Sequence, residues 1–428
     1  MNTRKYFNKF AAAAFILFAF ASFSCAQTAK SANPRPEKLL NNLKLLMWQN
    51  AAADQVTVKL RVHSGAAFDT LGKEGTMALL ADALFPNETV REFFKDDLGG
   101  SLTVESNYDY LQINATGSAD KVLTILETVA AAVTKPTLDK ETTAKVKAVR
   151  LERIKELERN PAYIADLAVA KRLFGDFPYG RSAEGTTASL AKIDFADLLL
   201  AKQRFLTADN ATLAVSGNIK YDYVFKAVRQ LFGGWEKADK KVPATFAQPS
   251  APDTKFYLIK SDINNASELR FAFRGSARRD KDFAAAQILT VVLQNRLKKK
   301  ENGKALLRQD SYFLPGLVVL KFADWDSSSL KRTADAGVSL SESFFNYVED
   351  LLGQNVSADE FQTAKADALR TSAGRDAIDA WLDVNSFQLA PLKDGAPSAN
   401  ATLADVQQVL ERWRKEAVVK TLLLKSAG

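Results

Sequence analysis

The sequence holds one histidine, His63, and one cysteine, Cys25, so little of it can do nucleophilic or metal chemistry. These counts exclude a disulfide framework, a cysteine-rich metal site, a Cys/His dyad and a multi-histidine metal cluster. A Ser/His/Asp triad needs only one histidine, but the G-x-S-x-G turn that presents its serine is absent. P-loop and dinucleotide glycine fingerprints are absent as well. We therefore interpret His63 as a packed residue at the end of a strand.

Strands and helices that could position chemical groups alternate along the chain. Val56–Val62 alternates apolar and polar residues with period two, which predicts a half-buried strand. Lys140–Arg159 reads as a long charged helix that Asn160-Pro161 ends. Further helices are expected at 75–85, 119–133, 162–174 and 194–205, one or two strands at 103–115, and a strand at 211–216.

Three short patterns of the first half recur in the second half, offset by roughly 210–220 residues, a longer period than those of solenoids. Their shared order and offset predict a duplicated domain. We predict an α+β fold of two homologous domains, each an antiparallel sheet with helices packed on one face. The paired patterns are Ser64-Gly65-Ala66-x-x-Asp69 with Gly275-Ser276-Ala277-x-x-Asp280, Ala144-Lys145-x-x-Ala148-x-Arg150 with Ala364-Lys365-x-x-Ala368-x-Arg370, and Leu190-Ala191-x-Ile193 with Leu403-Ala404-x-Val406.

The N-terminus has the features of an export signal. A basic stretch precedes the apolar run Phe10–Phe23, and small residues follow at Ser24-Cys25-Ala26. We predict cleavage before Gln27, with lipid attachment at Cys25 as the alternative. The expected location is the periplasm or cell envelope, with a membrane tether if Cys25 is lipidated.

Segment bounds follow from this signal and from a proline-containing stretch between the halves. We predict a signal peptide over 1–26, an N-terminal domain over 27–240, a linker over 241–253 and a C-terminal domain over 254–428. The formal net charge of +8 includes the signal, and the other basic residues are dispersed. No basic stripe with stacking aromatics is present, so a nucleic-acid partner is not expected.

Several motifs in order resemble those of the insulinase/pitrilysin metallopeptidases, the inverzincins. Gly75-Thr-Met-Ala-Leu-Leu-Ala-Asp-Ala-Leu-Phe85 is similar to their helix G-L-A-H-x-L-E-H-x-L-F. Glu152-Arg-Ile-Lys-Glu-Leu-Glu-Arg-Asn-Pro161 is similar to E-E-I-x-x-x-E-D-N-P. The remaining matches are Leu98-Gly99-Gly100, Thr103-Val104-x-Ser106-x-x-Asp109-Tyr110, Phe174-Gly-Asp-Phe-Pro-Tyr-Gly180, Gly185, Val215-Ser-Gly217-Asn218 and Phe232-Gly-Gly-Trp235.

The resemblance implies a zinc site whose chemistry this sequence has lost. The two histidine positions are Ala78 and Asp82, the position of the general base is Ala81, and the third ligand position is Glu152. Catalytic zinc needs about three protein ligands and a base for its bound water. Alanine supplies neither function, so we expect no catalysis and no zinc on this chain. Glu152 and Asp82 are then expected to be helix-surface carboxylates.

The resemblance also implies contacts to a peptide substrate. The stretch with Thr103 and Val104 includes the edge strand on which substrate backbone pairs in active members. An Arg/Tyr pair of the family's second domain falls on Lys299 and Leu306, of which only the lysine can donate a hydrogen bond. Arg308 and Tyr312 lie nearby with a different spacing. We interpret them as structural, with a substrate contact as the alternative.

Two hypotheses of different classes follow. In the first, the chain is a catalytically inactive subunit that pairs with a zinc-bearing paralogue to enclose a chamber for peptides or unfolded polypeptides. In the second, it is a stand-alone peptide-binding or scaffold protein of the cell envelope. Enzyme activity is expected only as part of a heteromer, with zinc only in the partner. A third hypothesis, catalysis by a replacement mechanism, lacks any second constellation of residues.

Overall fold

The computed structural model describes residues 33–238, 246–263, 266–325, 330–332, 338–390 and 397–425. The predicted signal peptide, Cys25 and part of the predicted linker lie outside these ranges. The described residues from Arg35 onward form one compact unit that contains both halves of the chain. No helix in the described ranges combines the length and the apolar character needed to cross a bilayer.

The first half is built on a six-stranded sheet with the order β1-β2-β6-β3-β5-β4. Its strands are β1 (Arg35–Lys38), β2 (Lys44–Gln49), β3 (Gln55–Val62), β4 (Ser101–Ser106), β5 (Leu111–Ser118) and β6 (Ala211–Gly217). Its helices are α1 (Thr76–Leu84), α2 (Glu88–Asp96), α3 (Val122–Thr134), α4 (Lys140–Leu157), α5 (Pro161–Phe174), α6 (Thr187–Lys192), α7 (Phe195–Phe205) and α8 (Tyr221–Phe232).

The second half is built on a five-stranded sheet with the order β7-β13-β8-β10-β9. Its strands are β7 (Phe256–Ser261), β8 (Ser267–Arg274), β9 (Ala305–Asp310), β10 (Leu317–Ala323) and β13 (Val419–Lys425), and β11 (Leu330–Arg332) pairs with β12 (Val338–Leu340) outside this sheet. Its helices are α9 (Phe283–Glu301), α10 (Glu342–Phe345), α11 (Tyr347–Gly353), α12 (Ala358–Ala373), α13 (Ala377–Ser386), α14 (Pro397–Asn400) and α15 (Leu403–Trp413).

The two sheets repeat one topology, which confirms the predicted α+β fold of two homologous halves. The order β7-β13-β8-β10-β9 matches β2-β6-β3-β5-β4 strand for strand. Purely antiparallel pairing is wrong for one pair in each sheet, since β2 runs parallel to β6 and β7 runs parallel to β13. The last strand of each half returns through helices to the centre of its sheet, and such a crossover allows parallel pairing.

The period-two pattern of β3 is confirmed, but its predicted half-burial is wrong. Val58 and Leu60 are buried among the helices on one face. On the other face the side chains of Lys59 and Arg61 are only 10% and 1% exposed. A helix of the second half, α13, covers this polar face and supplies carboxylates to both cations. The alternation within one strand cannot show that a helix more than 300 residues later in the chain packs on its polar face.

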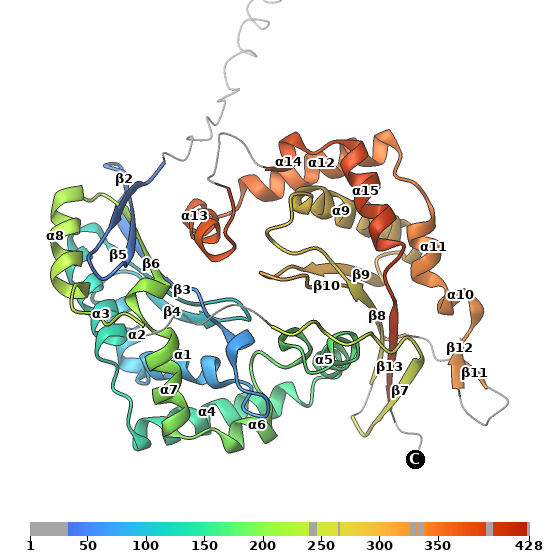
Figure 1. Ribbon diagram of the computed structural model, residues 1–428, viewed down its shortest axis with the longest axis horizontal. Helices are drawn as coiled ribbons and strands as arrows, with labels where there is room; N and C mark the ends of the chain where they lie inside the picture. Colours follow the sequence, from blue (N-terminus) through green and yellow to red (C-terminus); the bar gives the residue numbers. More distant parts are fainter. Residues whose placement is uncertain are drawn as a thin grey trace, which may run out of the picture. The chain divides into compact units, whose positions relative to one another are not determined.

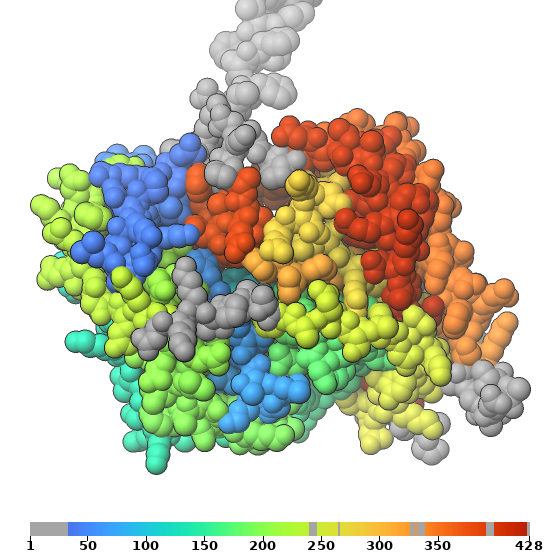
Figure 2. All heavy atoms as spheres, viewed as in Figure 1, coloured from blue at the N-terminus to red at the C-terminus, as the bar shows by residue number. Residues whose placement is uncertain are grey.

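Each half contributes one helix to the sheet of the other half (Figure 1). Apolar residues of α5, among them Val169, pack on Val319 and Val419 of the second sheet. Ile378 and Leu382 of α13 pack on the first sheet, against Leu46, Trp48 and Ala214. Figure 2 shows α13 as an orange-red surface beside the blue β1–β2 segment. Helices therefore cover both faces of each sheet, and not one face as predicted.

A buried arginine marks the same place in both exchanged contacts. On β3, Arg61 is in register with Thr212 and binds Asp383 of α13. On β8, Arg270 is in register with Thr421 and binds Asp166 of α5. The duplication therefore extends to the ion pairs that join the halves.

Local sequence explains the helix boundaries. The carboxylate of Asp139 accepts a bond from the Thr142 N–H at the start of α4, and the Asn160 side chain caps α5, whose first residue is Pro161. The second sequence echo lies on α4 and α12. The third echo joins non-equivalent residues, because Leu190 lies inside α6 whereas Leu403 begins α15. The counterpart of α15, judged by chain order before the last strand, is α7.

Candidate functional site

The helix with the degenerate zinc positions, α1, is fixed at its N-terminus by a buried carboxylate. Asp69 accepts hydrogen bonds from the N–H groups of Gly75 at 2.8 Å and Met77 at 3.0 Å. Burial raises the pKa of Asp69 to about 7, although these two bonds favour the ionised form. Gly75 has a φ of +91°, and a Cβ there would lie 2.8 Å from the carbonyl oxygen of Glu184. Glycine thus lets the loop before α6 approach α1 closely.

The alanines at the predicted ligand and base positions are inaccessible as well as inert. Ala78 is 2% exposed and Ala81 is 4% exposed. Asp82 is the one residue of α1 that is not buried. A substrate therefore could not reach the two positions, and their methyl groups offer no lone pair to a metal or a proton.

An arginine occupies the space between α1 and α4. The Nε of Arg150 donates to Asp82 at 2.6 Å, and its two terminal nitrogens donate to Glu184 at 2.8 Å and to the Ala78 carbonyl at 3.1 Å. Burial alone would lower the pKa of Arg150, but its bonds with Asp82 and Glu184 outweigh burial and raise it. One fixed cation thus joins α1, α4 and the loop before α6.

Glu152 lies on the surface of α4, as expected. Its side chain is 73% exposed and binds Lys155 of the same helix at 2.7 Å. Because residues two apart on a helix point to nearly opposite sides, Glu152 faces away when Arg150 faces α1. The α4 residue opposite Asp82 is therefore Arg150, a cation. Within the described ranges, no group of three or more His, Cys, Asp or Glu side chains is arranged to hold a metal.

The predicted peptide contacts of the first half lie on an edge strand. β4 pairs only with β5 in its sheet, so its outer edge offers unpaired backbone groups. Thr103 is exposed, and its hydroxyl accepts a 3.4 Å bond from Asn114, on the face of the sheet that carries Lys59 and Arg61. Val104 points to the other face and packs on the first core. Thr103 is thus placed to meet an added strand, whereas Val104 can offer only its backbone.

The candidates of the second half are separated. Lys299 is exposed near the end of α9. Arg308 lies on the edge strand β9, is 48% exposed, and binds Asp310 at 2.8 Å. Tyr312 packs against Tyr108 and Tyr179, with ring centroids 4.9 Å and 4.5 Å apart, and burial raises its pKa well above the usual value. Arg308 and Tyr312 are near neighbours, and no described contact joins Lys299 to either.

His63 lies beside a serine, but the pair lacks the groups of a catalytic triad. Its two ring nitrogens lie 3.0 Å from Ser386 Oγ and 2.9 Å from Thr212 Oγ1. A triad needs a carboxylate where Thr212 stands. Burial, with the nearby charges of Arg61 and Lys44, lowers the pKa of His63 to about 3. A ring this weakly basic cannot act as a general base at neutral pH.

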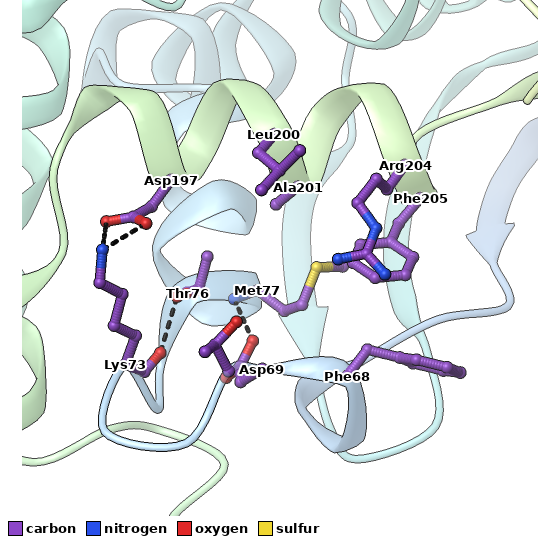
Figure 3. Close-up of a pocket in the computed structure, with 11 residues that line it drawn as sticks. Phe68, Asp69, Lys73, Thr76, Met77, Asp197, Leu200, Ala201, Arg204 and Phe205 are labelled. Carbon is purple, nitrogen blue, oxygen red and sulfur yellow. Dashed lines mark hydrogen bonds and ion pairs between the residues drawn. The ribbon is translucent and has the colours of Figure 1, made fainter. Parts of the chain in front are cut away.

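A surface pocket lies at the N-terminal end of α1 (Figure 3). It encloses about 360 Å³ of empty space, including its open mouth, between α7 and the loop before α1. Phe68, Met77 and Phe205 give it apolar walls. Its two acids are occupied, since Asp69 caps α1 and Asp197 binds Lys73 at 2.6 Å. The pocket is therefore no candidate for catalysis.

Comparison with known proteins identifies the family. Residues 44–187 match the sequence profile described as Insulinase (Peptidase family M16), and residues 192–367 match the Peptidase M16 inactive domain. The chain belongs to the insulinase family of peptidases, M16. In this M16 homologue the family's two histidine positions and its base position hold Ala78, Asp82 and Ala81, and the second half matches the profile described as the inactive domain.

Individual relatives agree with this assignment. A probable mitochondrial-processing peptidase subunit beta of Arabidopsis thaliana is 23% identical over 277 residues, 63% of this chain and 52% of the relative. The chain spans about half the length of the curated relatives it matches. The M16 inactive domain of Pseudomonas fluorescens superposes with a TM-score of 0.75, 17% identity and coverage of 93% and 99% of the two chains. The periplasmic protease PqqL of Escherichia coli gives 0.70 and 15%, covering 93% of this chain and 48% of PqqL.

Sequence reasoning missed Arg150 and Glu184, which define the degenerate site. The pattern that repeats as Ala364-Lys365-x-x-Ala368-x-Arg370 ends on Arg150 in the first half, so an arginine was visible there. The pattern did not show where the Arg150 side chain points. Its counterpart Arg370 on α12 is exposed and binds its own neighbour Asp367, so the repeat does not extend to the contact with α1. The facing carboxylate at position 82 was the remaining signal, since a half-buried acid requires a cation.

Proposed function

We propose that this protein is a pseudopeptidase subunit that binds extended polypeptide along the free edge of β4 and pairs with a zinc-bearing paralogue. One observation carries the proposal: the chemistry of α1 has been replaced by an Arg150 cross-link, while the neighbouring edge strand keeps its open backbone. Such an edge can hold a peptide by strand addition without cleaving it.

Pairing is supported by a relative that is itself named as a subunit, the plant processing peptidase subunit beta. In the proposed heteromer, this chain contributes a wall and a peptide-binding edge, and zinc belongs to the partner alone. Export to the cell envelope is supported by the N-terminal sequence and by the periplasmic location in the name of PqqL. Cleavage before Gln27 and lipid attachment at Cys25 remain the two alternatives for processing.

The test is cleavage of unfolded polypeptide by the purified chain, by a zinc-bearing M16 paralogue of the same cell, and by their mixture, with zinc measured in each. Activity that rises in the mixture, with zinc confined to the paralogue, supports the proposal. Chelator-sensitive cleavage by this chain alone contradicts it. If the mixture is no more active than the paralogue, but the chain binds peptide, the scaffold hypothesis takes its place.

Proline variants test the edge of β4 directly. Successive N–H groups of a strand point to opposite edges, so of Thr103 and Val104 one donates outward and the other toward β5. Proline at the residue whose N–H points outward should lower peptide affinity at a nearly unchanged melting temperature. Proline at the residue whose N–H points toward β5 removes a hydrogen bond of the sheet and should lower the melting temperature. Equal peptide affinity in both folded variants contradicts strand addition at β4.

A further inference from the structure

The contact between α13 and the first half contains an excess of positive charge around one carboxylate. Asp383 is 4% exposed and lies among three arginines that come from three different elements. Arg61 Nη1 on β3 donates to its Oδ1 at 2.6 Å. Arg278, from the loop between β8 and α9, donates to its Oδ2 at 2.9 Å, and Arg375, just before α13, donates to the same Oδ2.

The acids at the N-cap and in the first turn of α13 are already occupied. Asp376 binds Lys59, and Asp379 binds both Lys59 and Arg61. Asp383 thus has to balance Arg278 and Arg375 in addition to its share of Arg61. Within the described part of the chain, its Oδ2 is the one side-chain acceptor of both Arg278 and Arg375. A guanidinium group has five N–H donors, more than the bonds to Asp383 use.

The sharing of one oxygen forces two like charges together. Both guanidinium groups reach the same atom, so their donating nitrogens lie within about 6 Å of each other and repel. Burial and the charge of Arg375 lower the pKa of Arg278, although Asp383 opposes this. The ring of Phe283, with its centroid 4.6 Å from the Arg278 guanidinium carbon, blocks one face of that group. Its edge is left for hydrogen bonding.

The cluster opens to solvent on one side. The exposed fraction of the side chain rises from 1% at Arg61 to 16% at Arg278 and 41% at Arg375. Arg375 and part of Arg278 are therefore in contact with solvent. Planar guanidinium groups bind carboxylate and phosphate oxygens through paired hydrogen bonds, which fits them to an oxyanion.

We propose that Arg278 and Arg375 form a binding site for an oxyanion, a phosphate or the terminal carboxylate of a peptide, beside Asp383. The bound ion bridges the two guanidinium groups and removes their repulsion. The site is separate from the edge of β4 and from α1, so it stands whether or not the proposed peptide binding is correct.

The test measures the melting temperature of the purified protein against sodium phosphate, with sodium chloride at equal ionic strength as the reference. Phosphate should stabilise the wild type saturably beyond chloride. Arg375→Gln should weaken the apparent affinity about tenfold or more, because one charge-assisted contact is lost. Arg370→Gln is the matched control, since Arg370 is 79% exposed on α12 and should change nothing.

A second variant and a peptide probe complete the test. Asp383→Asn removes the competing negative charge and should tighten phosphate binding, and Arg375→Gln carries the conclusion if that variant fails to fold. A fluorescent peptide with a free C-terminus, compared with its amide, identifies the source of the oxyanion. Binding of the acid alone assigns a peptide carboxylate, and binding of phosphate alone assigns phosphate. The proposal is overturned if the wild type and Arg375→Gln respond equally to phosphate. It is also overturned if phosphate stabilises no more than chloride and the peptide acid and amide bind equally.

Discussion

Replacing Arg150 by methionine should destabilise the protein by about 3 kcal/mol. Removing one partner of a buried ion pair costs about 3–5 kcal/mol, because the other charge is left unpaired. Here the Asp82 and Glu184 side chains are 38% and 31% exposed, so water can rehydrate both carboxylates and the lower end of the range applies. Methionine keeps most of the apolar stem, which limits the loss of packing.

The melting temperature is the measurement. An unfolding entropy of about 2.1 cal/mol/K per residue, over the roughly 390 residues from Arg35 to Gly428, converts 3 kcal/mol into a decrease of about 4 °C. Arg153→Met is the matched control on the same helix. Arg153 is 59% exposed and its nearest acid is Glu184 at 3.3 Å, so its loss should cost less than about 1 kcal/mol. If Arg150→Met and Arg153→Met have the same melting temperature, Arg150 is not the cross-link between α1 and α4.

Three further outcomes are expected. Burial raises the pKa of Asp109 to about 7, above its unfolded value, so its contribution to stability is present at acid pH and lost as pH rises toward 7. Asp109→Asn should flatten that decline in denaturant titrations at pH 5–8, and an unchanged slope would contradict it. Burial and nearby cations lower the pKa of His63 to about 3, so its ring proton signals in NMR spectra should stay constant from pH 5 to 8, and any midpoint in that range contradicts the lowered pKa. Histidines at positions 78 and 82 together should retain no zinc while Arg150 remains, because its guanidinium repels the dication, and metal analysis after desalting checks this.

Much of the fold could be predicted because its signals are local. The alternation along β3, the cap at Asn160 with Pro161 after it, and the apolar run of α1 each follow from neighbouring residues. The repeat on α4 and α12 predicted the duplication, and the ordered motifs predicted the family. These elements coincide with the expected ranges to within a few residues, and 103–115 forms two strands, one of the two readings of that stretch.

The misses share a physical cause, which is long sequence separation. Lys59 was expected on an exposed face, but its partners Asp376 and Asp379 lie more than 300 residues away. Glu152 was assigned by motif position, and only the rotation of α4 against α1 reveals that Arg150 faces Asp82. Pairing between distant charges follows from tertiary packing, which neither periodicity nor a short motif contains.

The exchange of α5 and α13 has a consequence for the origin of the chain. A single half standing alone would leave its own crossing helix unplaced and one face of its sheet bare, with a buried-type arginine facing water. Two copies of such a half would each complete the other, as domain-swapped dimers do. The present chain has the arrangement expected when the genes of two such copies fuse. In that history association came before duplication, and Arg61 and Arg270 descend from one residue that first bound a neighbouring molecule.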